Sequence, residues 1–198
     1  MLNSGQNIVG NEWNHVAVKV KKTTQEVSFF LNNSNVSFSN VDLSEFSFNS
    51  NNQPLKIGTD DAMTNGNFKG EMDNLTIYDK AISHAQIEDS HATFPILKLD
   101  TSGDSGVLNA DVTLGESANI NSKNRNNEQN SAYNFDGSSS SYVSVSDQSY
   151  NDYKLNQLTF SAWINPSILT QNTPLLTKSL LQGQMQIGIN DSKKLFFK

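Results

Sequence analysis

An all-β sandwich of two antiparallel sheets with one short helix is the fold that this sequence predicts. Apolar residues recur with a period close to two in nearly every window that can be interpreted, which is the pattern of strands with one buried face. Clusters of Asn, Ser, Gly and Asp separate these windows, and such residues favour turns. Many short strands divided by turns are typical of a sandwich, and 198 residues are enough for one large domain.

The strands are expected in the following order along the chain. Residues 15–20 contain three alternating valines and form a hairpin with residues 26–31. The remaining expected strands are residues 54–58, 68–79, 141–146, 158–164, 175–178, 185–189 and 194–197. Their short lengths and the turns between them support the sandwich.

One segment carries a helical signal. Within residues 81–90, Ser83 and Gln86 have the spacing of a capping box, so we expect one or two helical turns there. Residues 119–130 are polar and rich in Asn, and we expect an exposed loop or a ragged connection between strands.

Composition excludes several classes of function. Lys and Arg number 14 against 20 Asp and Glu, giving a net charge of −6, whereas nucleic-acid binding requires a basic surface. Cysteine is absent, and no run of apolar residues is long enough to insert into a membrane. Asn and Ser make up about a quarter of the chain, which suits an extracellular β-protein. Residues 1–6 lack the features of a signal peptide, so we expect the chain to be a piece of a longer precursor.

Four segments together carry a family resemblance. Residues 11–18 contain a Trp-x-His-Val-Ala strand, and residues 68–83 contain a Gly-x-Met-Asp-x-Leu-x-Ile-Tyr strand followed by the helical segment. Residues 135–145 begin with Phe-Asp-Gly, and residues 158–164 include Ser-Ala-Trp. In this combination the chain resembles the laminin-G-like, concanavalin A-like jelly-roll family, which implies a jelly-roll sandwich.

The order of these segments departs from the family. Residues 1–92 resemble the C-terminal half of such a domain, and residues 93–198 resemble its N-terminal half. Either the chain is a circular permutant that closes on itself, or it is one period of a tandem array whose copies join head-to-tail. We favour the array, in which residues 90–95 link two adjacent domains and each half pairs with its complement in the next repeat.

Asp73 is the most informative single residue. Strict alternation places it on the face of Leu75 and Ile77, where a carboxylate must be paired, hydrogen-bonded or bound to a metal. The family resemblance implies a structural calcium ion held by Asp73, by Asp136 with Gly137, and less securely by Asp100 or Asp104. The alternative is an aspartate that caps a neighbouring turn.

Two loops are candidates for ligand binding. One is rich in oxygen ligands and contains Asp60, Asp61 and Asn65, although it lacks the spacing of an EF-hand. It is either a calcium-bridged ligand site at the rim of the sandwich or a solvated hairpin loop. The other contains Tyr150 and Tyr153, whose rings could contact a ligand.

Catalysis is not favoured. Glu71 and Asp73 lie two apart on one strand, which invites comparison with two-carboxylate glycosidases, but the third acid of related hydrolases is missing. No Gly-x-Ser-x-Gly sequence supports a serine nucleophile. Packing is the default interpretation of His15, and Trp163 either packs beneath a loop or lines a groove.

The sequence therefore predicts a non-catalytic extracellular module. The leading hypothesis is a structural or adhesive repeat of a surface or filament protein, with one structural calcium ion and neighbouring copies of itself as partners. The alternative is a calcium-dependent carbohydrate-binding module that recognises glycans or cell-surface polymers.

Overall fold

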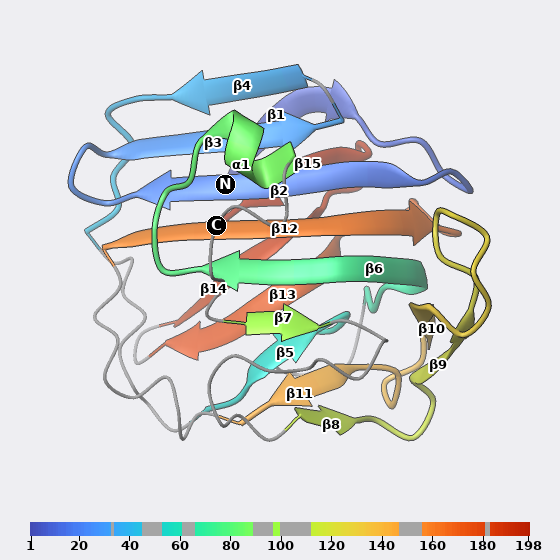
Figure 1. Ribbon diagram of the computed structural model, residues 1–198. Coiled ribbons are helices and arrows are strands. Elements are labelled where there is room, and N and C mark those ends of the chain that lie inside the picture. Colours follow the sequence, from blue (N-terminus) through green and yellow to red (C-terminus); the bar gives the residue numbers. More distant parts are fainter. Residues whose placement is uncertain are drawn as a thin grey trace.

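The computed structural model describes residues 1–32, 34–44, 53–60, 66–88, 97–99, 112–146, 156–180 and 183–198. Two antiparallel sheets pack face to face, which confirms the predicted jelly-roll sandwich (Figure 1). The elements are β1 (Leu2–Asn7), β2 (Asn14–Lys21), β3 (Glu26–Leu31), β4 (Ser34–Phe38), β5 (Leu55–Ile57), β6 (Lys69–Tyr78), α1 (His84–Glu88), β7 (Leu97–Leu99), β8 (Val112–Leu114), β9 (Asn119–Ser122), β10 (Ala132–Asp136), β11 (Val143–Val145), β12 (Gln157–Pro166), β13 (Thr173–Leu180), β14 (Gly183–Ile189) and β15 (Lys194–Phe197).

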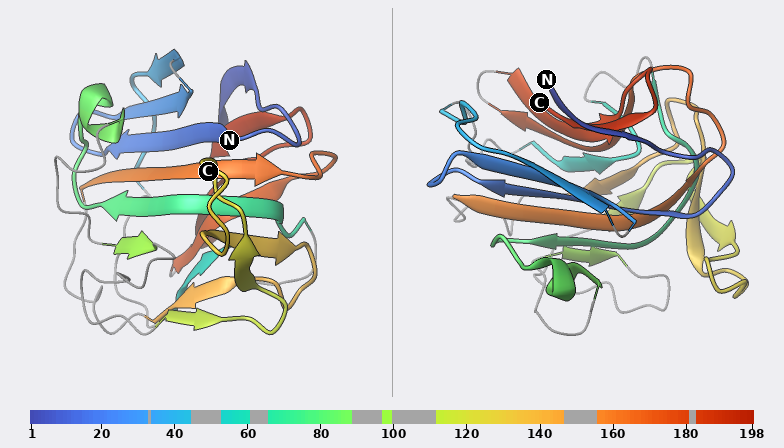
Figure 2. Two further views of the ribbon diagram at one scale, coloured as in Figure 1. Left: turned by 45° about the vertical axis from the view of Figure 1, so that its right-hand side comes forward. Right: turned by 90° about the horizontal axis from the view of Figure 1, so that it is seen from above.

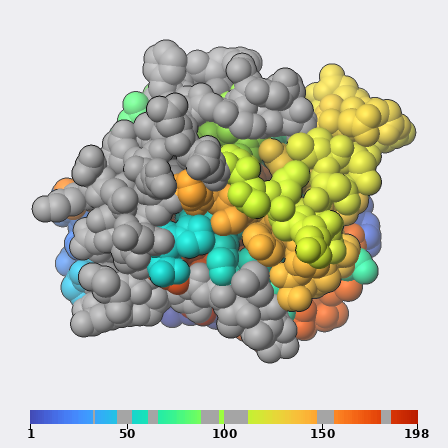
Figure 3. All heavy atoms as spheres, turned by 90° about the horizontal axis from the view of Figure 1, so that it is seen from below, coloured from blue at the N-terminus to red at the C-terminus, as the bar shows by residue number. Residues whose placement is uncertain are grey.

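The strands alternate between two sheets. The seven-stranded sheet has the order β1-β15-β14-β13-β5-β11-β8. The eight-stranded sheet has the order β4-β3-β2-β12-β6-β10-β9, and β7 pairs with the same edge of β6 as β10 does, farther along the strand. From below, β5, β11 and β8 lie side by side at the surface (Figure 3).

The core lies between the sheets and draws apolar side chains from both. Phe160 of β12 is fully buried and faces Val18 of β2 on one side and Ile77 of β6 on the other. A smaller apolar cluster lies on the outer face of the eight-stranded sheet, where α1 covers Phe30 and Tyr78 (Figure 1). These two clusters fix the sandwich and its one helix by apolar burial.

The helix begins as its capping box predicts. The backbone N–H of Ser83 donates to Oε1 of Gln86 at 2.9 Å, and the N–H of Gln86 donates to the hydroxyl of Ser83 at 3.3 Å. The predicted hairpin is also confirmed, with β2 and β3 paired from Val16 and Leu31 to Lys21 and Glu26.

A β-bulge in β6 corrects the face assigned to Asp73. Asn74 has a φ of 49°, and the ladder with β12 shifts by one residue between Thr76 and Asp73. An extra residue reverses the side-chain alternation of a strand. Asp73 therefore lies on the outer face of the eight-stranded sheet, whereas Leu75 and Ile77 point into the core.

Among the described residues, no helix is long and apolar enough to cross a membrane.

Candidate functional site

A row of three side chains crosses the outer face of the eight-stranded sheet. Trp163 of β12 is the register partner of His15 on β2 and of Asp73 on β6. The His15 ring stacks on the indole with centroids 5.0 Å apart and planes at 27°. His15 Nε2 is also hydrogen-bonded to the hydroxyl of Ser161 at 2.9 Å.

Arg125 covers this row on the outer face of the sheet. It is the sole arginine of the chain and comes from the loop between β9 and β10. Its Nη1 donates to Asp73 Oδ2 at 2.9 Å, and its guanidinium carbon lies 4.9 Å from the Trp163 ring centroid. We call His15, Asp73, Arg125, Ser161 and Trp163 the arginine cluster.

The loop that carries Arg125 is built around one asparagine. Asn124 is 8% exposed, and its Oδ1 accepts the backbone N–H groups of Asn126 at 2.9 Å and Glu128 at 3.1 Å. Its Nδ2 donates to the Glu128 carboxylate at 2.6 Å. These bonds hold the loop in a fixed shape, so Trp163 packs beneath it rather than lining an open groove.

The described residues do not bring Asp73 and Asp136 to one ion. Asp136 is the register partner of Lys69 in the β10–β6 ladder. Lys69 is four positions from Asp73 along β6, which corresponds to about 13 Å. Calcium binds its oxygen ligands at about 2.3–2.6 Å, so one ion cannot contact both carboxylates. The charge of Asp73 is met by Arg125 instead.

Asp136 makes a local turn of its own. Its Oδ1 accepts the backbone N–H of Ser138 at 2.8 Å, and hydrogen bonds to Ser138 lower the pKa of the Asp136 carboxyl. Gly137 follows with a φ of 84° beside Lys69. Asp100, the remaining predicted ligand, lies outside the described residues, as does Asp104.

Glu71 shares the outer face with Asp73, as expected from their spacing. Burial raises the pKa of the Glu71 carboxyl, which lies opposite Asn165. Asp73 is only 4% exposed beneath Arg125, so its carboxylate is closed to a substrate. In the described part of the chain, no three His, Asp or Glu side chains gather closely enough to hold a metal ion.

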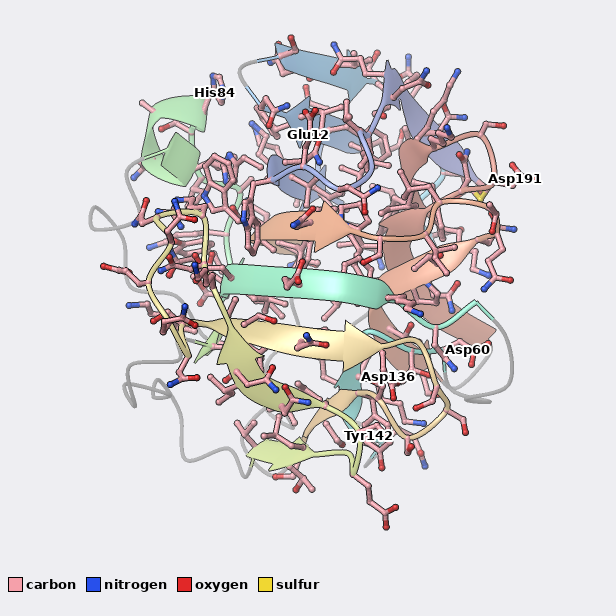
Figure 4. All side chains as sticks on the ribbon, turned by 90° about the vertical axis from the view of Figure 1, so that its right-hand side faces the viewer. Glu12, Asp60, His84, Asp136, Tyr142 and Asp191 are labelled. Carbon is pink, nitrogen blue, oxygen red and sulfur yellow. The ribbon has the colours of Figure 1, made fainter. Side chains whose placement is uncertain are left out.

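A second constellation lies at the other side of the sandwich, beside the seven-stranded sheet. Figure 4 shows Asp60 and His84 of α1 at opposite sides of the molecule. A pocket of about 310 Å³ opens beside Asp60, and we call it the Asp60 pocket. It is lined by Asp60, Gly66, Gln171, Asn172, Pro174, Gln186, Phe196 and Lys198.

A buried polar network supports the wall that carries Asp60. The Thr59 hydroxyl donates to Asn67 Oδ1 at 2.7 Å, and the Thr177 hydroxyl donates to the carbonyl oxygen of Thr59 at 2.9 Å. Thr59 and Thr177 are fully buried. Satisfied polar networks rigidify their surroundings, so Asp60 is held in place by β13 and by residue 67.

Two glycines allow the pocket to form. A Cβ on Gly66 would clash with the carbonyl oxygen of Asn172, so glycine lets these two loops touch through their backbones. A Cβ on Gly188 would come within 2.8 Å of the Phe196 ring. Glycine on β14 therefore lets the ring of Phe196, its register partner on β15, lie close to the strand.

Asp60 leaves one hydrogen-bonding capacity unused. Its Oδ1 is buried and accepts no hydrogen bond from the residues that the structure describes. A buried acceptor without a donor costs free energy, and such an atom in a binding site is met by a ligand, an ion or water. Lys198, a cationic residue, also lines this pocket.

The structure places only part of the predicted rim site. Asp60 lines the pocket as a candidate ligand-binding residue, whereas Asp61, Asn65, Tyr150 and Tyr153 lie outside the described residues. The sequence analysis did not identify the polar lining contributed by Gln171, Asn172, Gln186 and Lys198. Alternation alone could have placed Gln186 and Phe196 on an outer face, but not beside Asp60.

Arg125 was also missed, although the sequence held one signal for it. A single arginine among 14 basic residues is unusual, and arginine is the cation best suited to pair with a carboxylate while stacking on an aromatic ring. The sequence could not say which ring or which carboxylate it meets.

Comparison with known proteins agrees with this fold. Residues 1–88 match the family described as the concanavalin A-like lectin/glucanases superfamily, in its laminin-G group. Among curated proteins, no sequence matches this chain. The two-sheet jelly-roll agrees with this match over residues 1–88 and supports the resemblance to the laminin-G-like group of the concanavalin A-like superfamily.

Proposed function

We propose that this chain is a non-catalytic extracellular adhesive module that binds one neutral sugar unit of a glycan in the Asp60 pocket. The observation that carries the proposal is the buried Asp60 Oδ1, which has no hydrogen-bond donor among the described residues although Asp60 lines a polar pocket. The volume of about 310 Å³ is at the small end of ligand sites, which suits a single ring.

The chemistry of the lining favours a neutral ligand with hydroxyl groups. Asp60 needs a donor and Lys198 needs an acceptor, and a hydroxyl group can serve as either. A ligand with a net charge would be attracted by one of these two residues and repelled by the other, so neither sign of charge is favoured. The side-chain amides of Gln171, Asn172 and Gln186 add both donors and acceptors.

Apolar atoms contribute less to the match. Phe196 and Pro174 contribute carbon atoms to the same lining, but both residues are largely buried and expose little apolar surface to a ligand. Ligand sites commonly combine apolar surface with a few fixed polar groups, and this pocket relies on the polar groups.

A binding role fits this pocket better than hydrolysis does. Hydrolysis of a glycosidic bond ordinarily requires two carboxyl groups on either side of the bond. Asp60 is the one carboxylate among the described lining residues. The other paired acids, Glu71 and Asp73, lie on the eight-stranded sheet, where Arg125 covers Asp73.

Calcium stays a prediction for the rim of this pocket. Asp60 is an oxygen ligand of the kind that calcium prefers, and its Oδ1 has capacity for one more partner. An ion there would hold ligand hydroxyls through its open coordination positions. Binding is therefore measured both in calcium and in chelator.

The test is a titration with a panel of neutral hexoses and N-acetylhexosamines, followed by calorimetry. We expect Asp60→Asn to weaken the best ligand at least tenfold, or about 1.4 kcal/mol, because the carboxylate loses its charge-assisted hydrogen bond. Asp191→Asn is the matched control, since this exposed aspartate lies at the same side of the molecule but does not line the pocket (Figure 4).

Three results discriminate. Equal affinity in Asp60→Asn and the native chain contradicts the assignment of the pocket. Release of free sugar from an oligosaccharide contradicts a non-catalytic role. Binding that requires calcium and is lost in Asp60→Asn supports an ion at the rim.

A further inference from the structure

A row of three polar side chains lies beside the arginine cluster on the outer face of the eight-stranded sheet. Glu71 of β6 is the register partner of Asn165 on β12 and of Asn134 on β10. All three residues are half-buried. Opposite residues on neighbouring strands have Cβ atoms about 4.5–5.5 Å apart, so a small group placed over Glu71 can reach both asparagines. We call Asn134, Glu71 and Asn165 the acceptor row.

The two asparagines leave acceptors unused. Oδ1 of Asn165 is buried and accepts no hydrogen bond from the described residues, and Asp60 Oδ1 is the other such atom in the described part of the chain. Asn134 turns its Nδ2 to the hydroxyl of Ser122 at 2.8 Å, and no described group donates to its Oδ1. A buried acceptor without a donor costs free energy, so these oxygens favour a group that brings N–H or O–H donors.

Glu71 lies between these oxygens without a cation of its own. Among the described residues, no lysine or arginine forms an ion pair with its carboxyl. Lys69, two residues earlier on the same face, lies beside Gly137 and is the register partner of Asp136. Burial raises the pKa of the Glu71 carboxyl, although a hydrogen bond from the Asn165 side chain opposes that rise. A cation would therefore stabilise the ionised form of Glu71.

The arginine cluster shows what a carboxylate at this place on β6 takes as its partner. Asp73 lies two residues after Glu71 on the same face and receives both an N–H group and a positive charge from Arg125 at 2.9 Å. The left view of Figure 2 shows the yellow loop that carries Arg125 in front of green β6 and orange β12. This loop provides a cation for Asp73, whereas the described chain provides none for Glu71.

We propose that the acceptor row binds a primary ammonium group of a ligand. An ammonium group carries one positive charge and three donors, which match one carboxylate and two amide oxygens. A hydroxyl group has one donor and no charge. A guanidinium group is less suited, because it pairs best with both oxygens of a free carboxylate and Asn165 already bonds to the Glu71 carboxyl.

This inference goes beyond the sugar-binding proposal. The Asp60 pocket lies beside the seven-stranded sheet and is matched to a neutral ligand, whereas the acceptor row lies on the other sheet and requires a positive charge. Lysine side chains and amino sugars both carry a primary ammonium group, so the ligand is either a protein or a glycan with this chemistry.

The test is a titration of the native chain with n-butylammonium, followed by NMR of the asparagine side-chain amides. We expect saturable shifts of the Asn134 and Asn165 amide resonances, and we expect Glu71→Gln to weaken binding at least tenfold. Glu12→Gln is the matched control, since this exposed glutamate ahead of β2 lies outside the row (Figure 4). Equal affinity of Glu71→Gln and Glu12→Gln overturns the proposal.

A pH profile supplies a second readout. Because ammonium binding favours the ionised carboxylate, the affinity of the native chain should increase as the pH rises through the raised pKa of Glu71, and that of Glu71→Gln should not. The neighbouring acids are already matched, Asp73 by Arg125 and Asp136 by hydrogen bonds to Ser138 that lower its pKa. A level profile in the native chain also overturns the proposal.

Analogues separate the parts of the interaction. Binding of n-butanol as tight as that of n-butylammonium would overturn the requirement for charge, and equally tight tetramethylammonium would overturn the requirement for N–H donors. Tighter binding of methylguanidinium would overturn the choice of ammonium. Nα-acetyl-lysine amide and glucosamine both carry the group, so binding of either supports the proposal, and the tighter one identifies a protein or a glycan as its source. A failed ammonium titration leaves the titration of the Asp60 pocket untouched.

Discussion

The arginine cluster and the Asp60 pocket contain the same three kinds of group, yet only one of them is complete. Each joins a carboxylate, an aromatic ring and a cation: Asp73, Trp163 and Arg125 on one sheet, and Asp60, Phe196 and Lys198 beside the other. In the cluster, the loop between β9 and β10 delivers the cation to the carboxylate at 2.9 Å. In the pocket, Oδ1 of Asp60 has no donor within the described part of the chain.

This difference separates a stabilising constellation from a binding one. The same chemistry contributes to folding where the chain supplies all the partners, and becomes available to a ligand where one partner is missing. Residue type and charge alone would have ranked Asp73 above Asp60 as a site. The contacts reverse that order.

The largest expected effect comes from opening the arginine cluster. Arg125→Met removes the guanidinium from a carboxylate that is 4% exposed, and we expect the free energy of unfolding to fall by about 2–3 kcal/mol. The loss is smaller than for a fully buried ion pair because Arg125 itself is 29% exposed. Urea denaturation followed by tryptophan fluorescence measures it.

Lys123→Met is the control for this experiment, since Lys123 is an exposed cation in the same loop. We expect it to change stability by no more than about 0.5 kcal/mol. The double variant Arg125→Met with Asp73→Asn should recover part of the loss, because no buried charge is then left without its partner. Equal stability of Arg125→Met and Lys123→Met would contradict the structural role of the cluster.

The sequence predicted most of the inner strands and missed the edges. The hairpin, β5, β6 and β11 to β15 were expected, because buried strands carry a clear apolar pattern. The strands that went unpredicted are the four outermost ones, β1, β4, β8 and β9, the short β7, and the inner strand β10. Edge strands such as β4 face solvent along much of their length, so their sequences read as loops.

Of the candidate site, the sequence supplied residues but not their neighbours. It singled out Asp73 and Asp60, and the family resemblance implied calcium for the first. It could not reveal the bulge at Asn74, which moves Asp73 to the outer face, because an asparagine in a strand has no fixed conformation. Nor could it place Arg125 over Trp163, since 38 residues and a change of strand separate them.

A smaller effect should appear when the two aspartates are neutralised in parallel. Asp73→Asn replaces a paired carboxylate, and we expect a loss of about 1.5–3 kcal/mol. Asp60→Asn removes a charge whose Oδ1 has no donor, so stability should stay within about 0.5 kcal/mol of the native chain or increase. Thermal and urea unfolding of both variants in ligand-free buffer test this, and a loss in Asp60→Asn equal to that in Asp73→Asn would mean that the pocket is also a stabilising constellation.

The smallest expected effect comes from Glu71. This acid lies beside the arginine cluster, in which Arg125 pairs with Asp73. Burial raises the pKa of its carboxyl, so the folded protein holds this proton more tightly than the unfolded chain, where the pKa is about 4.3. The contribution of Glu71 to stability is fully present below that value and is lost as the pH rises through the raised pKa of the folded state. Asp136 has the opposite sign, because hydrogen bonds to Ser138 lower its pKa and its contribution is lost only in stronger acid. We therefore expect Glu71→Gln to gain stability relative to the native chain as the pH rises from about 4 to 7. Urea midpoints across this range measure the gain, and parallel curves for the two proteins would show that the carboxyl titrates alike in both states.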